Sequence, residues 1–225
     1  MPGNRSYLAI GFDMDGTLLR TDVNYSKLSK AVYDKMVSAG VPECLLSLKE
    51  SSLFNMDSGV SYLINNNRAG DVDKLIEDIR RDVDAVEIEN VSTAKQFEGG
   101  ERMIRYLKNK GYKIGVLTRG GRKYATKALT VAGVIDQLDA LVCRDDHHES
   151  EAKPSPAAMG YLAAELGVRP SDILYLGDHR MDYFCARDSG AGFIGVLTRY
   201  DKKDWEAVDP DINVIGTVAD LIGIL

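Results

Sequence analysis

Residues 7–17 read Tyr-Leu-Ala-Ile-Gly-Phe-Asp-Met-Asp-Gly-Thr, an apolar run that ends abruptly in two aspartates, a glycine and a threonine. A short apolar run bounded in this way is typical of a buried strand. Asp13 and Asp15 therefore follow the carboxyl end of the first predicted strand. Open α/β sheets bind ligands at this edge. Taken alone, the motif is more typical of an Asx-rich turn after a strand.

Further apolar runs that indicate buried strands recur along the chain, with helical patterns between the later ones. The strand runs are residues 113–117, 140–143, 173–176 and 193–197. The helical patterns are residues 100–109, 122–132, 156–166 and 182–189, and each is closely followed by a glycine, as C-terminal caps often are. Strands that alternate with helices predict an α/β fold, a doubly wound, Rossmann-like parallel sheet covered on both faces.

About a hundred residues separate the first predicted strand from the second, far more than the dozen or so that a crossover requires. Helical periodicity with polar faces runs through residues 26–39, 60–67 and 71–85, and nothing in this stretch indicates a strand. We expect residues 1–19 and 97–225 to form the core and residues 20–96 a small helical cap domain inserted into it. An ordinary helical extension packed beside the sheet is the alternative.

The composition is that of an ordinary globular protein, with 44% apolar and 28% charged residues. A net charge of −6 argues against nucleic-acid binding, which depends on lysine and arginine. No apolar stretch is long enough to cross a bilayer and no secretory signal is visible, so we expect no membrane association and a cytoplasmic location. Cys44, Cys143 and Cys185 are odd in number and lack a CxxC pair, which predicts buried free thiols.

Two further motifs carry groups that suit a phosphate. Thr118, Arg119 and Gly120 follow the second predicted core strand and offer a hydroxyl and a glycine-rich turn that could cradle phosphate. A capping threonine with turn glycines is the commoner explanation of such a motif. Lys153 lies in the segment 152–156, where two prolines make a rigid loop that can aim one ammonium group. Most single lysines on loops are solvated surface charges.

Asp178 and Asp182 bring two more carboxylates to the same edge of the predicted sheet. Asp178 follows the apolar run 173–176, and Asp182 begins a predicted helix. Magnesium prefers oxygen ligands and usually takes one or two carboxylates plus substrate phosphate, which Asp13 and Asp178 could supply. An acid in the first turn of a helix is favoured by the helix dipole in any case, so Asp182 also has a purely structural explanation.

The first acid pair has the groups that phosphoryl transfer can use. An aspartate such as Asp13 can attack a phosphoryl group as a nucleophile, and a carboxylate two residues later can handle the proton of the leaving group. The order acid pair, threonine, lysine, acid pair resembles the haloacid dehalogenase superfamily of phosphohydrolases, in the branch of phosphoglycolate phosphatases and β-phosphoglucomutases. The resemblance covers residues 7–198, through FDMDGTL, LTRG, AKPSP and GDHRMD, and includes the place of the inserted cap.

The resemblance implies a magnesium-dependent phosphatase that hydrolyses a small phosphate monoester, phosphoglycolate-like or sugar-phosphate-like, through a phospho-aspartyl intermediate. The implied partner is a small phosphorylated metabolite, and the oligomeric state, monomer or homodimer, stays open. The resemblance implies that Asp13 is the nucleophile and that Asp15 is the acid and base. Thr118 and Lys153, beside the turn of Arg119 and Gly120, would bind the phosphoryl group. Asp13, the main-chain carbonyl of Asp15, and Asp178 would bind magnesium, and Asp182 would support Lys153 or the metal.

Three other functions compete with this one. Members that cleave carbon–halogen bonds lack the acid found here at Asp15, which disfavours a dehalogenase. A phosphomutase would use the same core residues and differ in cap closure and water exclusion, so it remains the alternative. A non-catalytic phosphate-binding protein is disfavoured because the motif acids and Lys153 are all present. His147 and His148, in the less standard loop 144–151, lack a spaced third ligand and are left outside the site.

Overall fold

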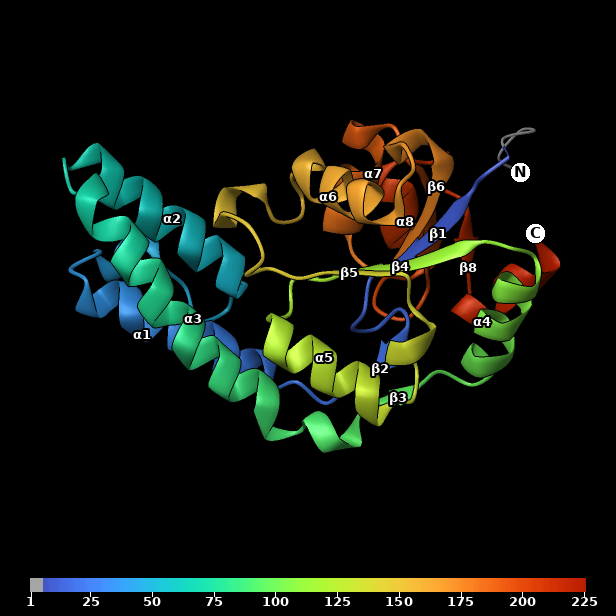
Figure 1. Ribbon diagram of the computed structural model, residues 1–225. Coiled ribbons are helices and arrows are strands. Elements are labelled where there is room, and N and C mark those ends of the chain that lie inside the picture. The colour runs from blue at the N-terminus through green and yellow to red at the C-terminus, as the bar shows by residue number, and fades with distance from the viewer. Residues whose placement is uncertain (1–5) are drawn as a thin grey trace. The chain divides into compact units, whose positions relative to one another are not determined.

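The computed structural model describes residues 6–225, and the chain divides into two compact units, Met1–Thr21 with Ser92–Leu225 and Asp22–Val91. The first unit contains a six-stranded sheet in the order β5-β4-β1-β6-β7-β8, with every neighbouring pair parallel (Figure 1). In that order the strands are Ala140–Val142, Lys113–Leu117, Ala9–Phe12, Ile173–Gly177, Gly192–Val196 and Val214–Ile215. The chain starts in the middle at β1 and builds outwards in both directions, which confirms the predicted doubly wound α/β fold.

Helices of the first unit cover both faces of this sheet. Figure 1 shows α6 and α7 on one side of the sheet and α4 and α5 on the other. The helices are α4 (Gly100–Asn109), α5 (Arg122–Val131), α6 (Pro156–Leu166), α7 (Arg180–Ser189) and α8 (Lys202–Val208). The prediction of 182–189 for α7 is wrong by two residues at its start, because the side chain of His179 caps the helix by accepting from the Met181 N–H.

Short 3-10 turns complete the connections in both units. They are η1 (Glu43–Leu45), η2 (Ala69–Asp71), η3 (Val91–Thr93), η4 (Ile135–Gln137), η5 (Glu149–Glu151), η6 (Pro170–Asp172) and η7 (Val218–Gly223).

A close contact between α6 and the sheet holds the strands in place. A Cβ at Gly115 of β4 would come within 2.7 Å of the Leu162 Cδ1 atom, so the absence of a side chain there lets the helix approach. Leu162 is fully buried, and burial of a leucine contributes about 1.5–3 kcal/mol. It belongs to a core cluster that includes Ala9, Leu117, Val142, Met159, Leu166, Ile173, Tyr175, Cys185 and Ala186. This packing makes the strand ends a rigid platform for the polar motifs.

A second, two-stranded sheet joins the segments that lead out of and back into the first unit. β2 (Leu19–Arg20) pairs antiparallel with β3 (Lys95–Gln96), with Leu19 opposite Gln96 and Arg20 opposite Lys95. The expectation of no strand in residues 20–96 is wrong at both ends of that range. Strands of two residues are too short to show an alternating pattern, so the sequence carries no signal for them.

The second unit consists of three helices with a core of their own. They are α1 (Tyr25–Ser38), α2 (Ser52–Asn65) and α3 (Val72–Glu89). The helix predicted at 60–67 is the second half of α2, which begins earlier because the Ser51 hydroxyl accepts the Phe54 N–H. The buried side chains that bring the helices together include Leu28, Val32, Met36, Leu63, Ile76, Ile79, Val83 and Val86.

The cysteines and the helix lengths bear on two further predictions. Within residues 6–225, no helix combines the length and the apolar character needed to cross a membrane. Cys143 and Cys185 are buried free thiols as predicted, and burial raises the pKa of each to about 12. The prediction is wrong for Cys44, which is exposed to solvent. It lies in η1, a short turn in which no residue is buried.

Candidate active site

The polar motifs meet at the carboxyl ends of three neighbouring strands. Asp13 follows β1, Thr118 follows β4 and Asp178 follows β6, and β1 lies between the other two. The Asp13 N–H continues the ladder by donating to the Leu176 carbonyl at 2.8 Å. Because β4 and β6 lie on opposite sides of β1, the strand order reverses here, and ligands of doubly wound sheets bind at such a point.

Lys153 reaches this strand edge from the turn before α6. Its side chain is 3% exposed, and its ammonium donates to Asp13 Oδ1 at 2.6 Å and to Asp182 Oδ1 at 2.7 Å. A third hydrogen bond, 3.0 Å long, goes to the Tyr175 hydroxyl. Just after Lys153, the Ser155 side chain caps α6 by accepting the Ala157 N–H. The ammonium therefore has a carboxylate on either side and a fixed direction.

Asp182 serves the helix and the lysine at once. It is the third residue of α7, where its Oδ2 accepts the His179 N–H at 3.1 Å and completes a capping box. Its other oxygen accepts from Lys153. Asp182 can therefore cap the helix with one oxygen and support Lys153 with the other.

The buried charges at this edge shift one another's protonation. Burial raises the pKa of Asp13 well above its ordinary value, with Asp182 and Asp178 acting in the same direction and the Lys153 ammonium opposing them. Burial, followed by the charge of Asp182, also raises the pKa of Asp178 to about 7. Burial alone would lower the pKa of Lys153, but Asp13 and Asp182 outweigh it and hold that pKa above its usual range. The crowding of these carboxylates thus opposes the ionisation of Asp13 and Asp178, whereas Lys153, and for Asp178 also Arg199, favours it.

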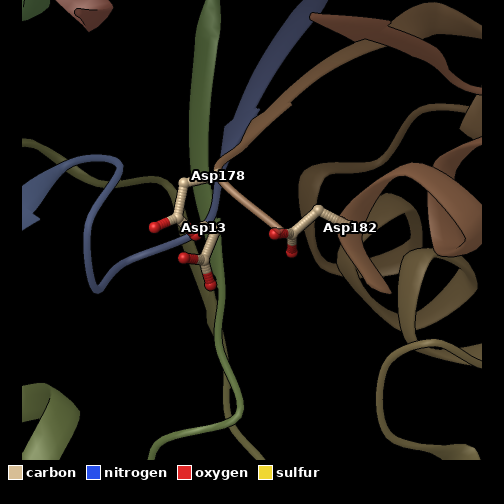
Figure 2. A group of neighbouring side chains, drawn as sticks. All are labelled: Asp13, Asp178 and Asp182. Carbon is tan, nitrogen blue, oxygen red and sulfur yellow. The ribbon is translucent and has the colours of Figure 1, made fainter. Parts of the chain in front are cut away.

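Asp13, Asp178 and Asp182 form a group that could hold a metal ion. Each offers a carboxylate oxygen, and these oxygens lie within 4.8 Å of one another. Figure 2 shows the carboxylates of Asp13 and Asp178 lying close together, with Asp182 directed toward them from α7. Hard oxygen donors in excess of positive charge suit Mg²⁺, which neutralises such groups. The donor set present here therefore fits that ion.

Asp15 is not part of this carboxylate cluster, and its side chain accepts hydrogen bonds from two hydroxyl groups. Thr21 Oγ1 donates to Asp15 Oδ1 at 2.6 Å, and the Tyr124 hydroxyl donates to the same oxygen at 2.5 Å. Burial raises the pKa of Asp15, and the hydrogen bonds from Thr21 and Tyr124 lower it in part.

The turn after β4 is tied to itself and to the Lys153 loop. The Gly120 N–H donates to Thr118 Oγ1 at 2.9 Å. The Arg119 guanidinium donates to the Lys153 carbonyl and to Glu149 Oε1, both at 2.5 Å. In this arrangement Arg119, expected beside the phosphoryl group, is directed at the loop that carries the lysine.

The two histidines of the following loop have other partners. The ring of His147 stacks on Tyr161 with centroids 3.4 Å apart. His148 caps η5 by accepting the Ser150 N–H at 3.3 Å. Neither contact involves the carboxylate cluster.

Three side chains of the site were not predicted from the sequence. They are Thr21, Tyr124 and Tyr175. Tyr175 lies inside the apolar run of β6 and Tyr124 on the buried side of α5, so in the sequence both resemble core residues. Only the hydroxyl group distinguishes them from phenylalanine, and a buried tyrosine hydroxyl usually needs a partner. That need was the one signal the sequence offered.

Comparisons with known proteins show which family the chain belongs to. A family model for haloacid dehalogenase-like hydrolases matches residues 10–196. The chain is 24% identical to validoxylamine A 7'-phosphate phosphatase of Streptomyces hygroscopicus subsp. limoneus, over 85% of this chain and 86% of that protein. It is 25% identical to a phosphoglycolate phosphatase of Haemophilus influenzae, over 88% of this chain and 89% of the relative. A crystal structure described as a predicted phosphoglycolate phosphatase from Haemophilus somnus superposes with a TM-score of 0.66 at 22% identity, covering 99% of each chain.

Proposed function

The chain belongs to the haloacid dehalogenase-like hydrolase family and, like its phosphatase relatives, is a phosphoric monoester hydrolase, and we propose that it acts through a covalent phospho-aspartyl intermediate on Asp13. The observation that carries this proposal is the buried contact of 2.6 Å between Lys153 and Asp13 at the end of the central strand. A carboxylate held there by an ammonium has the position and the charge partner that nucleophilic attack on a phosphoryl group requires.

In the proposed reaction Asp13 is the nucleophile and Asp15 transfers protons. An oxygen of Asp13 attacks phosphorus, the bond from phosphorus to the leaving oxygen breaks, and Asp15 gives its proton to that oxygen. Asp15 then takes a proton from water, which attacks the same phosphorus, releases phosphate and restores the Asp13 carboxylate. Lys153 stabilises the negative charge of the phosphoryl oxygens throughout, and the Thr118 hydroxyl helps to bind them.

We also propose that Asp13, the main-chain carbonyl of Asp15, and Asp178 hold Mg²⁺. When bound, the ion offsets the repulsion between the carboxylates and the phosphate dianion. Asp182 then supports Lys153, since Lys153 and the His179 N–H already occupy one of its oxygens each. Excess chelator should abolish turnover and added Mg²⁺ restore it. Mg²⁺ should also raise the melting temperature of the wild type and have much less effect on Asp178→Asn.

The proposed substrate is a compact phosphate monoester, phosphoglycolate-like or sugar-phosphate-like. The names of the relatives support this class, since one acts on validoxylamine A 7'-phosphate and another on phosphoglycolate. A screen of phosphoglycolate, hexose phosphates and aryl phosphates, with released phosphate measured, would identify the preferred group. Movement of phosphate between positions of a sugar without release would instead favour a phosphomutase.

The mechanism is tested by replacing the nucleophile alone. Asp13→Asn should lower kcat by at least about a thousandfold, because an amide cannot form the acyl phosphate. Asp136→Asn is the matched control, since Asp136 is exposed and lies in η4 away from the strand edge, and it should keep full activity. A folded Asp13→Asn protein with near wild-type turnover would contradict the mechanism.

A further inference from the structure

Two hydroxyl groups converge on one oxygen of Asp15. Thr21 donates to Oδ1 at 2.6 Å and Tyr124 donates to the same atom at 2.5 Å. A carboxyl oxygen has two lone pairs, so two donors on Oδ1 leave no site there for a further proton. A proton carried by Asp15 then resides on Oδ2.

Tyr124 reaches Asp15 from a distant part of the chain. It is the third residue of α5, 109 positions away in sequence, and it is 2% exposed. Its ring packs against the turn after β4, where a Cβ at Gly120 would come within 2.9 Å of the Tyr124 Cδ1 atom. Gly120 therefore leaves the space in which this ring lies, and the ring sets the place of the hydroxyl.

We infer that Tyr124 is a positioning residue for proton transfer to the leaving group. Its hydroxyl, together with that of Thr21, holds Oδ1 of Asp15 so that the proton is delivered from Oδ2. This inference rests on the proposed function, in which Asp15 protonates the leaving oxygen.

A purely structural role for Tyr124 makes a different prediction. A buried tyrosine whose hydroxyl only satisfies a neighbouring carboxylate would, when replaced, weaken turnover of all substrates to the same extent. A positioning role affects only reactions that need the proton. An alkoxide leaving group needs protonation, whereas p-nitrophenolate leaves readily without it.

The test compares phosphate monoesters whose leaving groups range from p-nitrophenol to simple alkyl alcohols. The ratio kcat/KM is the quantity to measure, because it reports the steps up to departure of the leaving group. Tyr124→Phe keeps the ring and removes the donor. We expect kcat/KM to fall by about ten- to a hundredfold for an alkyl phosphate and by no more than about threefold for p-nitrophenyl phosphate.

Three companion variants separate positioning from packing. Tyr183→Phe removes a hydroxyl that donates to Asp209 outside the site, and it should leave the leaving-group dependence unchanged. Thr21→Val removes the second donor to Oδ1 and should steepen that dependence, which keeps the inference testable if Tyr124→Phe fails to fold. In an Asp15→Asn background, Tyr124→Phe should change the alkyl-to-aryl ratio by less than about twofold, because no proton remains to be positioned.

Equal losses for alkyl and aryl esters in a folded Tyr124→Phe protein would show a packing role and overturn this inference alone. A wild-type protein that releases phosphate from none of the esters would overturn the proposed function, and the inference with it.

Discussion

All three hydrogens of the Lys153 ammonium have an acceptor. Two go to the carboxylates of Asp13 and Asp182, and the third goes to the neutral Tyr175 hydroxyl. That hydroxyl in turn donates to the Leu117 carbonyl at 2.8 Å. Tyr175 therefore connects the lysine to the end of β4, immediately before Thr118. The orientation of Lys153 depends on a residue that belongs to none of the four motifs.

Replacing Tyr175 by phenylalanine tests this connection. Tyr175→Phe keeps the buried ring but leaves the Leu117 carbonyl without its donor and Lys153 without its third acceptor. We expect the free energy of unfolding to fall by about 1–3 kcal/mol and kcat by about three- to tenfold. Urea denaturation and steady-state kinetics measure both. Tyr161→Phe, whose hydroxyl meets Glu151 near the surface, should change neither by much, and an unaltered Tyr175→Phe protein would refute the connection.

At this scale the sequence singled out the acids and the lysine as candidates but not the tyrosines. Asp13 and Asp178 stand out because each closely follows an apolar run that predicts a buried strand. A carboxylate is rarely buried unless it has a charged partner or a function. Tyr124 and Tyr175 give no such contrast, since an aromatic ring within a buried strand or helix is ordinary core. The sequence also could not predict the direction of the Arg119 guanidinium, because that direction depends on the position of Glu149 in the folded chain.

The loop after β1 brings its backbone against a side chain that follows β6. Gly16 has φ +80°, and a Cβ there would lie 2.1 Å from Asp178 Oδ2. Gly111, after α4, has φ +82°, and a Cβ there would meet nothing within 4 Å. The two glycines share the left-handed conformation that favours this residue, but only Gly16 adjoins the proposed metal ligand.

This pair of glycines separates backbone strain from damage to the site. Both Gly16→Ala and Gly111→Ala should lose about 1 kcal/mol of stability because alanine disfavours positive φ. Only Gly16→Ala should also displace the Asp178 carboxylate and weaken Mg²⁺ binding by more than about tenfold. Calorimetric Mg²⁺ titration beside urea unfolding measures both effects. Equal Mg²⁺ affinity in the two variants would show that Gly16 matters only for the turn.

Element prediction succeeded where the sequence has a bounded apolar run or a helical pattern followed by glycine, and failed where it has neither. The runs before Asp13 and Asp178, and the glycines after α6 and α7, are strong signals because burial and positive φ constrain the residue type. β2, β3, β8 and α8 were missed. β2, β3 and β8 have two residues each, too few to form an apolar run like those of β1 and β5, and α8 has seven residues, too few for a clear helical stripe.

Over the whole molecule, the helical unit has its own buried core and is entered and left through β2 and β3. These strands pair in the first unit, with Arg20 opposite Lys95. The segments that flank residues 22–91 are therefore held side by side without help from the helices. A short linker should be able to join them without disturbing the sheet.

All four chemical motifs lie outside residues 22–91, and we therefore propose that the helical unit selects the organic part of the substrate. Replacing residues 22–91 by a short glycine-serine linker tests this proposal. The strand ends, Lys153 and Asp178 remain, so Mg²⁺-dependent hydrolysis of an aryl phosphate should survive at a reduced level. Preference for the best metabolite over the aryl phosphate, measured as a ratio of kcat/KM values, should collapse, because the strand-end motifs that remain recognise only the phosphate group that both substrates share. A folded linker variant that keeps the full preference would assign selection to the first unit.

The covalent intermediate on Asp13 is tested most directly by trapping it. Wild-type protein mixed with a good substrate and Mg²⁺ is quenched in acid within the turnover time, digested and analysed by peptide mass spectrometry. The account predicts one phosphoryl group on the peptide that contains Asp13, lost after brief treatment with hydroxylamine and absent from Asp13→Asn. Rapid turnover with no phosphorylated Asp13 at any quench time, or a phosphoryl group on another residue, would contradict it.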